Sequence, residues 1–94
     1  MISQIPIKID RVEKPLLDRE ILRVAIIAEL DAINLYEQLA ATTDNEKIKK
    51  VLLEIAGEEK THVGELQALL LKEDAEQVEE LEKGRKEVEE LVGR

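Results

Sequence analysis

Two carboxylates and one imidazole occupy positions of this sequence where apolar side chains are expected. Glu59 and His62 stand three positions apart, so in a helix their side chains lie one turn apart on the same face. Glu29 lies 30 positions before Glu59 in the sequence, and it too is surrounded by apolar residues at helical spacing. A buried carboxylate without a partner is strongly destabilising, and carboxylate oxygens with imidazole nitrogens are ligands for iron, manganese and zinc. These three residues therefore predict a metal site.

Each of the three residues belongs to a stripe of mostly apolar residues that recurs every three or four positions. This spacing is typical of a helix that packs one face against a neighbour. The first stripe consists of Leu22, Ile26, Glu29, Ile33, Tyr36 and Ala40. The second stripe consists of Ile48, Leu52, Ile55, Glu59, His62, Leu66 and Leu69. The sequence therefore predicts two amphipathic helices whose packed faces carry the candidate ligands.

The two predicted helices are joined by a short polar segment, which makes them an antiparallel hairpin. We expect helices over residues 16–41 and 44–72, with Thr43 and Glu46 forming a capping box. Glu29 lies about 14 residues before the turn, and the Glu59–His62 pair lies about 17 residues after it. At about 1.5 Å of rise per residue, the three side chains are expected to meet at one level.

The fold class expected is all-α, with the hairpin of residues 16–72 flanked by two smaller parts. Residues 1–15 alternate apolar and polar side chains between prolines, which favours an extended arm. Residues 73–94 are expected to form a shorter C-terminal helix and tail, capped by Asp74 and Gln77. Its apolar stripe is thin, so we expect this helix to pack on a neighbouring subunit or to extend into a linker.

Composition excludes several classes of function. Acidic residues outnumber basic ones by 22 to 14, and a surface with a net charge of −8 repels nucleic acid. The 94 residues contain no cysteine, so disulfides and thiolate metal sites are excluded. No apolar run is long enough to span a membrane, and residues 1–9 lack the apolar core of a signal peptide. We therefore expect a cytoplasmic protein without nucleic-acid or membrane partners.

A dimer would complete the metal site. Carboxylate bundles that bind two metal ions take a Glu from each of two helices and a Glu-x-x-His from each of the other two. This chain supplies one of each, so a two-fold homodimer would form a four-helix bundle with the two-ion site on its symmetry axis. Four glutamates would then neutralise two divalent cations. A small aliphatic core also favours oligomerisation. Iron fits such a site, with manganese or zinc as substitutes.

Each candidate ligand also has a simpler explanation. A lone helical histidine is more often a hydrogen-bonded or surface residue than a ligand, and Glu59 belongs to a charge run with Glu58 and Lys60. Glu29 is harder to explain in this way because its helical neighbours are apolar. Three such residues at one level favour the metal site over the separate explanations.

Three further polar residues lie near the predicted site. Tyr36, two turns from Glu29, is either a hydrogen-bond donor to the site or a filler of the core. Glu65 and Asp31 lie off the stripes, and we interpret both as solvated surface acids.

Around these residues the sequence resembles the encapsulated ferritin family, within the ferritin-like superfamily. The resemblance covers roughly residues 16–92, and its most specific stretches are AELDAINLYEQLA at 28–40 and EEKTHVGELQALLL at 58–71. It implies a half-ferritin whose dimers form four-helix bundles and assemble further into an open ring of five dimers, a decamer. It also implies that Glu29, Glu59 and His62 are the ligands of a ferroxidase centre, with Tyr36 close to it.

The same resemblance implies a function. The expected enzyme is a ferroxidase, an Fe(II):oxygen oxidoreductase, that works inside an encapsulin shell where the iron mineral is stored. One family acid that guides iron toward the site falls on Ala28, whereas its companion is retained as Asp31. No shell-docking peptide follows Leu91, and the sequence leaves open whether Arg94 is the natural C-terminus or the domain is fused to a shell protein.

Two other functions remain open from the residues alone. One is a rubrerythrin-like di-metal peroxide reductase, which without cysteines would need an external electron donor. The other is a non-enzymatic helical oligomerisation or cargo module with a structural metal.

Overall fold

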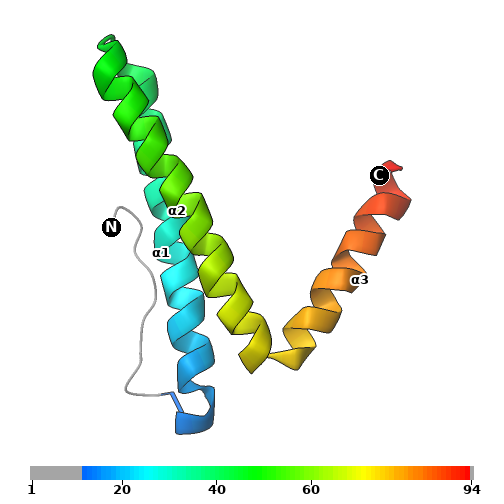
Figure 1. Ribbon diagram of the computed structural model, residues 1–94. Helices are drawn as coiled ribbons and strands as arrows, with labels where there is room; N and C mark the ends of the chain where they lie inside the picture. Colours follow the sequence, from blue (N-terminus) through cyan, green and yellow to red (C-terminus); the bar gives the residue numbers. More distant parts are fainter. Residues whose placement is uncertain (1–11, 94) are drawn as a thin grey trace.

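The computed structural model describes residues 12–93, which form three helices (Figure 1). The helices are α1 (Lys14–Thr42), α2 (Glu46–Glu73) and α3 (Ala75–Val92). The all-α fold predicted from the sequence is confirmed, and the expected helix bounds differ from the observed ones by at most two residues. Most of the predicted N-terminal arm, residues 1–11, lies outside the described part of the chain.

Helices α1 and α2 pack side by side along their length as an antiparallel hairpin (Figure 1). The buried apolar side chains are few, and two of them are alanines, which let the helix axes approach closely. These buried residues are Ile33 and Ala40 on α1, and Ala56 and Leu70 on α2. Many larger apolar side chains stay exposed, so one hairpin buries only part of the apolar surface that its sequence provides.

The turn between α1 and α2 is capped by a residue other than the one expected. The side chain of Asn45 accepts hydrogen bonds from the backbone N–H groups of Lys47 (3.0 Å) and Ile48 (3.2 Å), so Asn45 is the N-cap of α2. The predicted capping box at Thr43 is therefore wrong. The Thr43 hydroxyl instead accepts a hydrogen bond from the backbone N–H of Asn45 and holds the turn before the cap.

The connection between α2 and α3 is a single residue, Asp74, which ends one helix and begins the next. Its carboxylate accepts a hydrogen bond from the backbone N–H of Gln77 at 3.1 Å, so the predicted cap is confirmed. Beyond this elbow α3 leaves the hairpin and points away from it (Figure 1). None of its residues is buried, and it ends at Gly93, whose left-handed backbone (φ 74°) is typical of a helix C-terminus.

Among the described residues, no helix is long and apolar enough to cross a membrane.

Candidate metal centre

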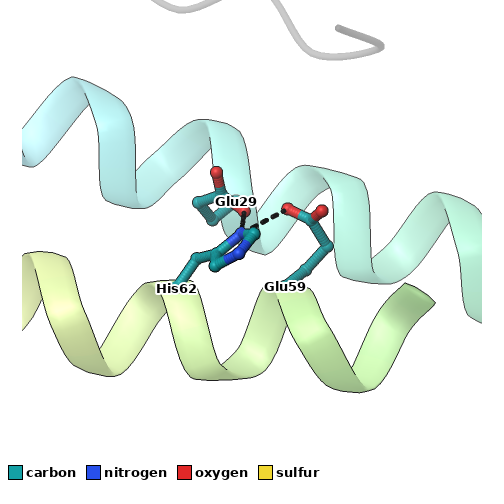
Figure 2. A group of neighbouring side chains, drawn as sticks. All are labelled: Glu29, Glu59 and His62. Carbon is teal, nitrogen blue, oxygen red and sulfur yellow. Dashed lines mark hydrogen bonds and ion pairs between the residues drawn. The ribbon is translucent and has the colours of Figure 1, made fainter. Parts of the chain in front are cut away.

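Glu29 on α1 and the pair Glu59 and His62 on α2 meet between the two helices (Figure 2). The Nδ1 atom of His62 lies 3.3 Å from Oε2 of Glu29 and 3.6 Å from Oε2 of Glu59. The imidazole ring therefore stands between two carboxylates that come from different helices. The sequence predicted that these residues would meet at one level, and the structure brings them together there.

Helical geometry explains why the side chains of Glu29, Glu59 and His62 converge. Glu59 and His62 are three residues apart on α2, so both side chains project from one face. Glu29 projects from the face of α1 that also carries buried Ile33, one turn further along. Because those faces pack against each other, the side chains of the three residues enter the same space.

The donor set fits a divalent metal ion. One candidate ligand atom from each residue lies within 4.8 Å of the others. Metal–oxygen and metal–nitrogen bonds of about 2.0–2.2 Å place the ligand atoms of one ion at most about 4.4 Å apart, so small side-chain rotations suffice to bind one. Two carboxylates and an imidazole, without sulfur, suit iron, manganese or zinc.

The three candidate ligands are partly exposed to solvent on the side of His62. The side chains of Glu59, Glu29 and His62 are 19%, 25% and 46% exposed, so the imidazole is the least covered of the three. An open pocket of about 200 Å³ adjoins it, lined by Glu29, His62, Glu65 and Leu66. Glu65, interpreted from the sequence as a solvated acid off the stripe, thus borders the pocket of the candidate ligands.

Two other sequence candidates lie on α1. Tyr36 is half-buried there. Asp31 does not belong to the group of converging ligand atoms found among residues 12–93. The catalytic or supporting role expected for Tyr36 remains a prediction, as does the metal-binding role of Glu29, Glu59 and His62.

Comparison with known proteins gives consistent matches. A family model described as rubrerythrin matches residues 20–92. The chain is 64% identical over 74 residues to a ferritin-like–encapsulin shell fusion protein of Pyrococcus furiosus, a match that covers 79% of this chain and 21% of that protein. It is 43% identical over 56 residues to the encapsulin nanocompartment cargo protein EncC of Myxococcus xanthus, covering 60% of this chain and 43% of that protein. The chain thus spans less than half the length of either relative.

A solved structure covers nearly the same length. The crystal structure of the encapsulated ferritin domain from Pyrococcus furiosus matches with a TM-score of 0.86 and 53% identity. The match covers 100% of this chain and 98% of that one, so all three helices share its ferritin-like arrangement. Together with the family model over residues 20–92, this match shows that the chain belongs to the encapsulated ferritin family of rubrerythrin-like proteins.

Proposed function

We propose that the protein is a ferroxidase that oxidises Fe(II) to Fe(III) at a di-iron site shared between two copies of the chain. The observation that carries this proposal is the convergence of Glu29, Glu59 and His62 between α1 and α2. Each copy would contribute two carboxylates and one imidazole. Two copies would therefore supply the four carboxylates and two imidazoles that di-metal carboxylate bundles use.

The exposure of the site supports the shared arrangement. His62 is 46% exposed, and the pocket beside it is open in a single chain. Val51 and Leu69 are 55% and 52% exposed, and they lie 11 and 7 residues from His62, which places them on the same face of α2. A second hairpin packed on this face would cover the apolar side chains and the open side of the site together.

Charge balance also favours two divalent ions in the shared site. Four glutamates carry four negative charges, which two divalent cations neutralise, so the dimer would avoid uncompensated charge in its interior. In this arrangement Glu59 from each copy would bridge the ions, whereas Glu29 and His62 would each hold one ion. The protein's contribution is to position both ions and to exclude bulk water from them.

The reaction would transfer one electron from each of two Fe(II) ions to dioxygen. Two protons from solvent then complete the reduction of dioxygen to hydrogen peroxide, and the Fe(III) ions leave as precursors of the stored mineral. The iron is therefore the substrate of the reaction.

Stopped-flow absorbance after mixing with Fe(II) in air tests the proposal. The wild-type protein should oxidise iron faster than buffer, and Glu29→Ala and His62→Ala should each reduce the rate toward that of buffer. Glu54→Gln, which removes an exposed acid of α2 outside the site, serves as the matched control and should keep the wild-type rate. Wild-type rates in both ligand variants would show that the assignment is wrong.

The setting of this activity is inferred from the relatives. One relative is described as a shell fusion protein and the other as an encapsulin cargo protein, which supports association of this chain with an encapsulin shell. We accordingly propose that the protein works inside an encapsulin compartment in the cytoplasm, as dimers assembled into a ring-shaped decamer. Sedimentation of the protein alone and together with a shell protein would test the assembly and the association separately.

A second candidate is a peroxide reductase with the same two-metal site. The match of residues 20–92 to a rubrerythrin family model favours it. The two functions differ in oxidant, so turnover with hydrogen peroxide should be compared with turnover in dioxygen. Faster oxidation with peroxide would favour the reductase, whereas metal binding without any oxidation would favour a structural metal in a cargo module.

A further inference from the structure

Asp74 is the buried charged residue of the described chain, and it lies at the elbow between α2 and α3. The residue is 5% exposed. Its Oδ2 atom lies 2.8 Å from Nη2 of Arg23 on α1 and accepts a hydrogen bond from it. The two side chains therefore form an ion pair. The contact links residues 51 positions apart, so it joins the beginning of the hairpin to the beginning of α3.

The elbow has further polar contacts with α1. The second carboxylate oxygen of Asp74 accepts the backbone N–H of Gln77 in the first turn of α3. Arg19, one turn before Arg23, donates from Nη2 to the backbone carbonyl of Glu73 at 3.2 Å. This carbonyl is at the C-terminus of α2, where a positive charge also interacts favourably with the helix dipole. Two arginines of α1 therefore hold the two consecutive residues where one helix ends and the next begins.

Burial of side chains does not restrain the direction of α3 within the described chain. No residue of α3 is buried, and the helix separates from the hairpin directly after the elbow (Figure 1). Its large apolar side chains, which are Val78, Leu81, Val88, Leu91 and Val92, are all exposed. Within residues 12–93, packing of an apolar face therefore does not set the angle between α3 and the hairpin.

We propose that Arg23 and Asp74 form a latch that fixes the direction of α3 relative to the hairpin, separately from the metal centre. The Asp74 side chain is 7% exposed, and such a carboxylate is disfavoured without its cationic partner, so contact with Arg23 stabilises the elbow. Loss of the ion pair would expose the Asp74 carboxylate to solvent, and α3 could then adopt several directions relative to the hairpin. The latch thereby determines where the apolar stripe of α3 points.

Two substitutions separate the latch from helix capping. Asp74→Asn removes the charge but keeps a side-chain oxygen that is equally good at a helix N-cap. Arg23→Gln leaves the cap untouched and removes the cation. Both variants should keep α3 helical while releasing its direction. Asp74→Ala removes the cap and the ion pair together, so it should also shorten the helix.

The experiment measures the distance between two spin labels. Because the chain contains no cysteine, Gln67→Cys on α2 and Glu87→Cys on α3, both at exposed positions, give a clean labelled pair. The labelled chain is diluted into an excess of unlabelled chain, so that each distance is measured within one molecule. Double electron–electron resonance should give one narrow distribution in the parent and a distribution about twofold or more broader in Arg23→Gln and Asp74→Asn. The control Arg85→Gln, which breaks the contacts of Arg85 with Glu82 and Glu89 within α3, should keep the narrow distribution.

Helix content and metal binding show whether the hairpin stays intact in the two variants. Circular dichroism and Co(II) binding should be unchanged in Arg23→Gln and Asp74→Asn, because the hairpin and its metal centre stay intact. A narrow, parent-like distribution in both variants would overturn the latch. Failure of both variants to fold, while Arg85→Gln folds, would overturn it as well, because the ion pair would then stabilise the hairpin itself.

Discussion

The Nδ1 atom of His62 lies 3.3 Å from Oε2 of Glu29, although the two residues are 33 positions apart in the sequence. This contact joins α2 to α1 at the level where Glu59 also reaches the gap between them. An ordinary helical hairpin would fill this level with apolar side chains. The three polar groups therefore mark the part of the hairpin whose residues are explained by function better than by packing.

Metal binding should raise the stability of the folded protein. A ligand that binds only the native state stabilises it by about 2.7 kcal/mol at a concentration 100 times its dissociation constant. We expect Fe(II) without oxygen, or Zn(II), to raise the melting temperature measured by circular dichroism, and a chelator to reverse the effect. Glu29→Gln should abolish most of this rise, whereas Glu54→Gln should retain it. An equal rise in the two variants would place the stabilising metal elsewhere.

Asn45→Ala should destabilise the hairpin by about 1 kcal/mol, because α2 loses the side chain that accepts two of its first backbone N–H groups. Lys50→Ala, an exposed substitution on the same helix, should change the free energy of unfolding by less than about 0.5 kcal/mol. Urea unfolding of both variants measures the difference. An unchanged midpoint for Asn45→Ala would contradict its assignment as the cap.

Gly57→Ala should stabilise α2 by about 1 kcal/mol, since glycine is a poor helix former in a helix interior. A Cβ atom added at this position meets no other atom within 4 Å in the single chain. The reverse change at an exposed alanine of the same helix, Ala68→Gly, should cost a similar amount. Thermal unfolding together with mass in solution checks the pair. A loss of stability in Gly57→Ala, with a smaller assembly, would show that another chain approaches Gly57.

Acid should weaken the elbow at Asp74. The hydrogen bond from the backbone N–H of Gln77 holds the pKa of the Asp74 carboxyl below its usual value, although burial opposes this shift. The hydrogen bond from Arg23 and the charges of Arg19 and Arg23 lower this pKa further. Because the folded pKa lies below the unfolded value of about 3.9, the stability from Asp74 is present above that pH and is lost as pH falls through the folded pKa.

The comparison of wild type with Asp74→Asn isolates this contribution. The stability difference between the two proteins should be constant near neutral pH and should shrink as the pH falls below about 4. The Arg85 hydrogen bond also lowers the pKa of Glu82 on the surface of α3, so Glu82→Gln shows how much of the acid-dependent loss comes from α3 rather than from the elbow. A difference that does not change between neutral and acidic pH would show that Asp74 is not charged in the folded chain.

The sequence was sufficient to predict the helices and the convergence of the three candidate ligands. The stripes containing Glu29, Glu59 and His62 follow the helical repeat, and the short turn fixes how the two stripes align. Periodicity and turn length therefore determine which residues meet, and no detail of side-chain packing is needed. The sequence does not single out the cap at Asn45, because Thr43 with Glu46 fits a capping box and Asn45 is also a favoured N-cap residue. The two possibilities differ in the residue at which α2 begins.

The contacts at the elbow could not be predicted from the sequence. The sequence around Asp74 predicts a helix cap, but Arg23 lies off the apolar stripe of α1, where exposed residues are expected. Arg23 and Asp74 come together because the C-terminal end of α2 packs beside the beginning of α1 in the folded hairpin. Glu65 also lies off the stripe, and the sequence does not predict that it borders the pocket beside His62.

Anomalous diffraction from crystals grown with Fe(II) without oxygen tests the shared site most directly. Two iron peaks should lie between two chains, each within about 2.0–2.2 Å of oxygen or nitrogen atoms of Glu29, Glu59 or His62, with ligands from both chains. Iron held by one chain alone, or peaks remote from these three side chains, would contradict a centre built by pairing two hairpins.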